Sequence, residues 1–116
     1  MNIQEIESFI RAGIQEAMAE GWQIGCKEFG SFENKCGCAL TLAFRNDPNV
    51  IDPAISCDIA HEKFGYDMWP FMWGFDGNEM QRYYGSEAMF ELFELGKRFR
   101  EEYKPKRIHN GVIQHE

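Results

Sequence analysis

The feature that most constrains the fold is a three- and four-residue spacing of apolar positions near both ends of the chain. Near the N-terminus the spaced residues are Ile3, Ile6, Ile10, Ile14 and Ala17. Near the C-terminus they are Met89, Leu92, Gly96, Phe99 and Tyr103. Such spacing places these residues on one face of an α-helix, which has to be buried against another element. The sequence therefore predicts two amphipathic helices.

Local signals predict where these two helices begin and end. Asn2 and Glu5 have the spacing of a capping box, and Gly21 follows the last turn of the first helix. The last helix is expected from about Ser86 to the residues before Pro105. Gly96 lies inside it, where glycine costs about 1 kcal/mol relative to alanine, so we expect another backbone to approach closely there.

Two further helices are predicted in the middle of the chain. Asp52-Pro53 can cap and begin a helix that runs to Phe64, and Gly65 can end it. Asp67 can cap the stretch MWPFMWGF, in which Pro70 falls within the first turn, and Gly74–Gly77 is expected to form a turn.

Residues 22–44 allow two interpretations. Residues 22–28 alternate between apolar and polar, as a strand does, whereas the run 36–44 fits either a strand or a buried helix. We favour a helix over about 36–45, which gives a mainly α fold, a small single-domain helical globule of four or five short helices. The alternative is an α+β fold with a hairpin from residues 22–28 and 36–44.

The length of 116 residues and the 44% hydrophobic content predict one packed globular domain over residues 1–105. Residues 106–116 lack a periodic pattern and are expected to be a loose C-terminal tail. No apolar run approaches the roughly 20 residues that span a bilayer, and the first residues lack the cationic start of a signal peptide. We therefore expect a cytoplasmic protein without membrane contact.

The charge distribution is uneven. Residues 1–96 carry six basic and sixteen acidic groups, whereas residues 97–116 carry six basic and three acidic groups. The net charge of −7 argues against nucleic-acid binding. The basic groups are explained most simply by a solvated helix C-terminus, where the helix dipole favours them.

Four cysteines invite a metal or thiol interpretation. Cys36-x-Cys38, together with Cys57 and His61 four residues apart on one helix face, could form a Cys3His zinc site. A thiol at the N-terminus of a helix from Cys36 could instead be activated, with His61 as its base. Because Cys-x-Cys is tighter than the usual zinc spacing and free cysteines are commonly buried, we favour thiols that pack in the core.

Aromatic residues are concentrated in residues 68–84. The candidates for an interaction surface are Trp69, Phe71, Trp73, Phe75, Tyr83 and Tyr84. Such side chains are enriched at the centres of protein interfaces, although a small domain also uses them to fill its core. One short helix cannot easily bury all of them, so we expect part of this segment to contact a protein partner or a second copy of the chain.

Three fragments, CGCALTLAF, GFDG and ELGKRFREEY, occur in this order in the chain. Together they resemble short bacterial and phage proteins without a known activity. The resemblance implies that Cys36 and Cys38 precede a helix and that Gly74–Gly77 form a turn. It assigns no functional residues.

These observations favour a small cytosolic, non-catalytic interaction or regulatory protein that needs no cofactor and uses an aromatic surface. In a phage setting, a small acidic protein of this kind could inhibit a host protein by occluding its cationic site. The alternative is a thiol- or zinc-dependent protein built on Cys36, Cys38, Cys57 and His61.

Overall fold

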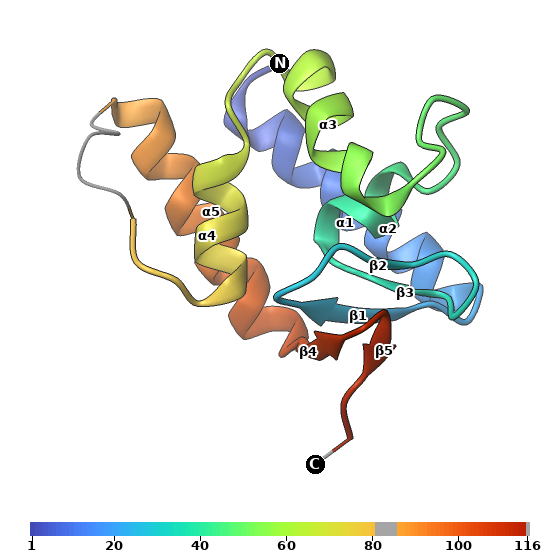
Figure 1. The fold of residues 1–116 in the computed structure, drawn as a ribbon. Helices are drawn as coiled ribbons and strands as arrows, with labels where there is room; N and C mark the ends of the chain where they lie inside the picture. The colour runs from blue at the N-terminus through green and yellow to red at the C-terminus, as the bar shows by residue number, and fades with distance from the viewer. Residues whose placement is uncertain (81–85, 116) are drawn as a thin grey trace.

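The computed structural model describes residues 1–80 and 86–115, which form a mixed α+β fold (Figure 1). The helices are α1 (Ile3–Ala19), α2 (Ala39–Phe44), the 3-10 helix η1 (Pro53–Ile55), α3 (Ser56–Phe64), α4 (Trp69–Asp76) and α5 (Glu87–Tyr103). The strands are β1 (Gln23–Cys26), β2 (Gly30–Ser31), β3 (Cys36–Gly37), β4 (Lys106–His109) and β5 (Val112–Ile113). The predicted helical globule therefore also contains a sheet, so the fold is not purely helical.

The capping box of α1 acts as predicted, and α5 begins at the predicted position. The side chain of Asn2 accepts the N–H of Glu5 at 2.8 Å, and the carboxylate of Glu5 accepts the N–H of Asn2 at 3.0 Å. The hydroxyl of Ser86 accepts the N–H of Met89 at 3.2 Å and starts α5. The buried stripe of α1 consists of Ile6, Ile10, Ile14 and Ala17, as its spacing predicts.

α4 and α5 lie side by side (Figure 1) and approach most closely at two glycines. A Cβ atom added to Gly96 would collide with the carbonyl oxygen of Phe71, and one added to Gly74 would collide with that of Phe93. The close approach predicted at Gly96 is thus confirmed. The turn predicted at Gly74–Gly77 is instead the last turn of α4, which ends at Gly77 in the left-handed conformation (φ 78°).

Residues 22–44 combine parts of both interpretations. β1 pairs with β3 in parallel, with Gln23 opposite Cys36, and β2 runs antiparallel to β3. The predicted hairpin is therefore wrong, because β2 brings the chain back so that β3 lies parallel to β1. The helix begins only at Ala39, since Cys36 and Gly37 are used by the sheet and Cys38 is the N-cap of α2.

Residues 106–113 were predicted to belong to a loose tail, but in the structure they form two strands. β4 pairs in parallel with β1, and β5 pairs with β4, which gives the strand order β2-β3-β1-β4-β5. Ile108 and Ile113 form a small buried cluster with Cys36. Gly25 lies against them, and a Cβ atom there would meet both isoleucine side chains. This burial attaches residues 106–113 to the domain.

The main core lies among the helices and the inner strands. It includes the fully buried rings of Phe71, Phe75 and Phe99, packed with the apolar faces of α1 and α5. The radius of gyration of 13.1 Å matches a single compact domain of this length. Among the helices of the described residues, none combines the length and apolar character needed to cross a bilayer.

Candidate functional site

The structure divides the predicted aromatic surface between core and solvent. Phe71 and Phe75 are fully buried, so they cannot form part of an exposed surface. Trp69 is 40% exposed, and Trp73 is partly buried. Tyr83 and Tyr84 lie outside the described residues. Trp69, at the beginning of α4, is therefore the predicted candidate that the structure places most openly on the surface.

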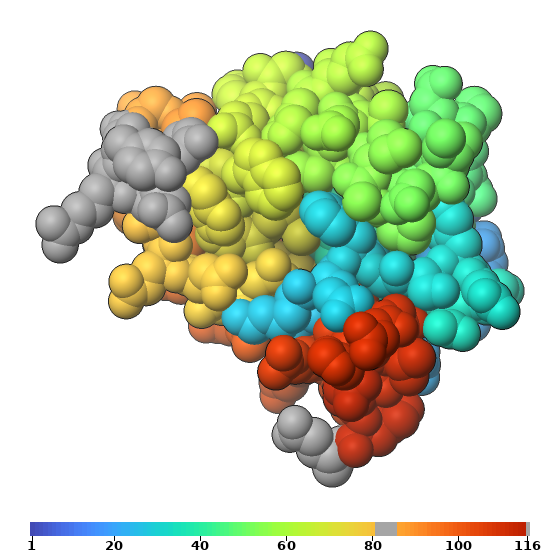
Figure 2. Space-filling view, viewed as in Figure 1, coloured from blue at the N-terminus to red at the C-terminus, as the bar shows by residue number. Residues whose placement is uncertain are grey.

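Two rings from distant parts of the sequence lie beside Trp69. The ring of Phe29 packs edge-to-face against it, with centroids 6.3 Å apart, and the ring of His61 lies with its centroid 6.4 Å away. We call Phe29, His61 and Trp69 the Trp69 patch. In Figure 2 the segment that contains Phe29, in cyan, meets the green and yellow segments of α3 and α4 on the visible face.

Phe29 is held in place by backbone contacts on both sides. The N–H of Lys27 donates to the carboxylate of Asp76 at 3.0 Å, and the carbonyl oxygen of Phe29 accepts the N–H of Cys38 at 3.2 Å. Burial raises the pKa of the Asp76 carboxyl group. The loop after β1 is thus fixed to α4 and to the start of α2. Sequence reasoning missed Phe29, because no local pattern near it indicates that it contacts Trp69.

His61 is fixed by the chain that follows α3. The N–H of Met68 donates to Nδ1 of His61 at 2.7 Å, and the carbonyl oxygen of Tyr66 lies 3.2 Å from the same nitrogen. The neutral tautomer in which Nδ1 accepts the Met68 N–H carries its proton on Nε2. Nε2 lies 3.6 Å from Sγ of Cys57. In this tautomer the imidazole can donate a hydrogen bond to the sulfur but cannot take up the thiol proton. The structure therefore brings Cys57 and His61 together without giving His61 the form of a general base.

The other predicted sulfur ligands are separated. Cys38 is fully buried in the main core, where Thr41 joins it to Ser56 by hydrogen-bond contacts of 3.4 and 3.3 Å. Cys36 belongs to the separate cluster with Ile108 and Ile113, and its thiol donates to the carbonyl oxygen of Gly111 at 3.2 Å. In the part of the chain that the structure describes, no three His, Cys, Asp or Glu residues gather as a metal-binding group.

Burial disfavours the thiolate form of these cysteines. It raises the pKa of Cys57 to about 12, and it also raises the pKa values of Cys36 and Cys38. The side chain of Cys57 is 1% exposed, so a reagent or substrate in solution does not reach it in this conformation. Reactive cysteines need the opposite environment, which is cationic and partly open to solvent.

Carboxylates flank the Trp69 patch. Asp67 accepts the N–H of Trp69 at 3.0 Å, and its carboxylate lies 4.0 Å from Nδ1 of His61. On the other side, the lining of a hollow of about 380 Å³ includes Phe29, the carboxylates of Glu28 and Asp52, and Lys27. The ammonium of Lys27 donates to the side chain of Asn78 at 3.0 Å. The patch therefore combines an exposed indole with a border of three carboxylates and one ammonium, which is negative on balance.

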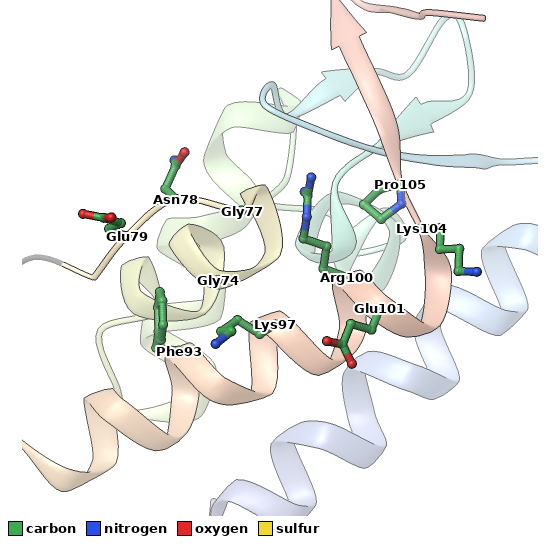
Figure 3. A pocket seen from close by; sticks show the side chains of 10 residues that line it. All are labelled: Gly74, Gly77, Asn78, Glu79, Phe93, Lys97, Arg100, Glu101, Lys104 and Pro105. Carbon is green, nitrogen blue, oxygen red and sulfur yellow. The ribbon is translucent and has the colours of Figure 1, made fainter. Parts of the chain in front are cut away.

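A larger hollow lies elsewhere, between α4 and α5 (Figure 3), and we call it the α4–α5 groove. It measures about 730 Å³ and is lined by Gly74, Gly77, Asn78, Glu79, Phe93, Lys97, Arg100, Glu101, Lys104 and Pro105. One guanidinium nitrogen of Arg100 donates to the carbonyl oxygen of Phe75 at 2.9 Å and lies 3.7 Å from Sγ of Cys26. The ammonium of Lys97 lies 5.7 Å from the ring centroid of Phe93. The groove thus has edges of mixed charge, because Glu79 and Glu101 line it together with the basic residues.

Comparison of the chain with models of protein families, with curated proteins and with solved structures finds no match. The functional interpretation therefore depends on the geometry of the chain itself.

Proposed function

We propose that this protein is a non-catalytic binding protein that holds a partner protein at the Trp69 patch. The observation that carries the proposal is the exposed indole of Trp69, which is braced by Phe29 and His61 from two other segments. A rigid, partly exposed tryptophan loses little conformational entropy on binding, and truncating such a residue at an interface often costs 2 kcal/mol or more.

The charge of the surroundings suggests the chemistry of the partner. Asp67, Glu28 and Asp52 border the patch, and residues 1–96 carry ten more acidic than basic groups. A lysine or arginine of the partner could lie over the indole ring and be attracted by these carboxylates. The proposed partner is therefore a protein with a basic surface, and binding would occlude that surface, as an inhibitor of the phage type does.

The thiol interpretation has less support. The Cys57–His61 contact would favour it, but Cys57 is buried, its pKa is raised to about 12 by burial, and Nδ1 of His61 accepts a backbone N–H. A zinc site on the four predicted ligands would require Cys36 to leave its own cluster with Ile108 and Ile113.

The test is affinity capture from the source cells with immobilised wild-type protein, Trp69→Ala and Met18→Ala. Met18 is the matched control, because it is a large apolar residue on α1 that is exposed to a similar extent, 43% against 40%. Circular dichroism and a thermal melt establish that both variants are folded. We expect a basic protein that the wild type and Met18→Ala retain, that Trp69→Ala loses, and that high salt releases.

Two results would contradict the proposal. One is a captured protein that the folded Trp69→Ala variant binds as well as the wild type does. The other is a specifically captured protein whose retention is independent of salt, since that would remove the role given to the acidic border.

A further inference from the structure

The outward face of α5 carries a regular series of residues that the Trp69 patch does not use. The series has alternating steps of three and four residues and consists of Glu87, Phe90, Glu94, Lys97, Glu101 and Lys104. It lies opposite the buried face of α5, which is formed by Leu92, Leu95, Gly96 and Phe99. Phe90 is 56% exposed, and the side chains of Lys97 and Glu94 are 52% and 40% exposed. Within the single chain these two side chains form a loose surface ion pair of 3.8 Å, which pairing with a second copy would exchange for two intermolecular ones.

Residues with this spacing lie along one line of a helix, so they can face the corresponding line of a second helix. Phe90 is the one apolar residue of the series, so its charges decide which orientation of the second helix fits. The first half contains Glu87 and Glu94, with a net charge of −2, whereas the second half contains Lys97, Glu101 and Lys104, with a net charge of +1. A helix face that is acidic at one end and basic at the other is complementary to its own copy when the two helices run antiparallel.

The pairing can be followed residue by residue. With the two-fold axis between Leu95 and Gly96, Glu94 lies opposite Lys97 of the second copy, and Glu87 lies opposite Lys104 of the second copy. Because a two-fold interface uses the same patch on both molecules, each of these ion pairs occurs twice. This antiparallel register thus matches Glu87 and Glu94 with basic positions, while the third acidic residue of the series, Glu101, lies opposite Phe90.

Phe90 also contacts the second copy in this register. It lies opposite Glu101 of the second copy, and Glu101 lines the α4–α5 groove together with Lys97, Lys104 and Phe93 (Figure 3). The ring can pack against the methylene stems of Lys97 and Lys104 while their ammonium groups stay in water. In this contact the second copy covers the exposed part of the Phe90 ring.

We propose that the outward face of α5 is a self-association surface, on which a second copy of this chain binds in the antiparallel register described above. The proposal is independent of the Trp69 patch, since the two surfaces share no residue. The complementarity is electrostatic, so the dimer is expected to be reversible and sensitive to salt.

Sedimentation velocity at low salt, over a range of protein concentrations, measures this association. We expect a monomer–dimer equilibrium for the wild type. Reversing one charge, in Glu94→Lys or in Lys97→Glu, turns two attractive pairs into two repulsive ones, and we expect the dissociation constant to rise about tenfold or more in each variant. The reversal Glu62→Lys on α3 is the matched control and leaves the association as in the wild type.

Mixing the two reversed variants provides the sharpest test. In a heterodimer of Glu94→Lys with Lys97→Glu, both pairs again join opposite charges, so the mixture is expected to associate like the wild type. Phe90→Ala is expected to weaken the dimer while leaving the thermal melt of the monomer nearly unchanged, because Phe90 is exposed in the single chain.

The proposal is overturned if the wild type remains monomeric at about 1 mM and low salt, a concentration at which even weak pairs are populated. It is equally overturned if the chain dimerises but both reversed variants do so as tightly as the wild type, or if their mixture associates no better than either variant alone.

Discussion

The thiol of Cys57 is expected to resist alkylation although it lies 3.6 Å from a histidine ring. Burial raises its pKa to about 12. At pH 8 an ordinary thiol with a pKa near 8.5 is about one-quarter thiolate, whereas a thiol with a pKa of 12 is thiolate in about one molecule in 10⁴. The ratio of these two thiolate fractions predicts that Cys57 is labelled about 10³-fold more slowly than a free thiol. Burial of the side chain slows the reaction further.

The assay is a time course with iodoacetamide at pH 8, followed by digestion and peptide mass spectrometry, with a cysteine-containing reference peptide in the same tube. Unfolding the protein in urea should bring all four cysteines to similar rates, which shows that the fold protects them. In the variant His61→Ala we expect labelling of Cys57 to stay slow or to become faster through local opening. The reasoning is refuted if Cys57 reacts faster than the reference peptide at pH 6, or if His61→Ala slows its labelling, because either result would make His61 an activating base.

Three further predictions concern stability. Gly96→Ala should destabilise the fold by about 1–3 kcal/mol, because the new Cβ meets the carbonyl oxygen of Phe71. This cost exceeds the gain from the better helix propensity of alanine. A thermal melt should show the midpoint falling by several degrees. Because the pKa of Cys57 is raised on folding, unfolding releases its proton at high pH, so above about pH 9 this thiol should lower the free energy of unfolding by up to about 1.4 kcal/mol per pH unit. Cys36 and Cys38 add to this fall, and in urea unfolding at a series of pH values Cys57→Ala should reduce the total slope. Glu28→Gln should speed hydrogen exchange in the β4–β5 hairpin, because the carboxylate of Glu28 accepts the N–H groups of Asn110 and Gly111 at 2.9 and 3.1 Å. Unchanged exchange would show that these bonds do not stabilise the hairpin.

The parts of the fold that could be predicted from the sequence are those fixed by neighbouring residues. The capping box of Asn2 and Glu5, the start of α5 near Ser86 and the end of α3 at Gly65 all depend on a few neighbouring residues, and each is confirmed. The long stripes of α1 and α5 are also local signals, since each repeats over several turns.

The alternation in residues 22–28 indicated β1, but the other strands and the pairing of the sheet could not be predicted, because the paired residues are distant in sequence. Gly25 pairs with Lys106, and Cys36 pairs with Gln23, in elements of two to four residues. The strands of two residues are too short to show periodicity. In residues 106–113 the only buried side chains, those of Ile108 and Ile113, are too far apart to form a visible pattern.

The candidate site was predictable only in part. The number of large side chains around α4 correctly indicated that this stretch could not be wholly buried, and the predicted candidates included Trp69. It could not separate Trp69 from Phe71 and Phe75, which are fully buried where α4 packs closely on α5. It also could not find Phe29, which reaches the patch because the Lys27 N–H donates to Asp76, a contact 49 residues away in the chain.

The most direct test of the binding proposal is a hydrogen-exchange footprint of the complex with the captured partner. We expect slower exchange, relative to the free protein, in the loop around Phe29, in η1, at the end of α3 near His61 and at the start of α4 near Trp69. A footprint that leaves these four segments unchanged and falls instead on the β4–β5 hairpin or on α5 would contradict the proposal that the Trp69 patch is the binding site.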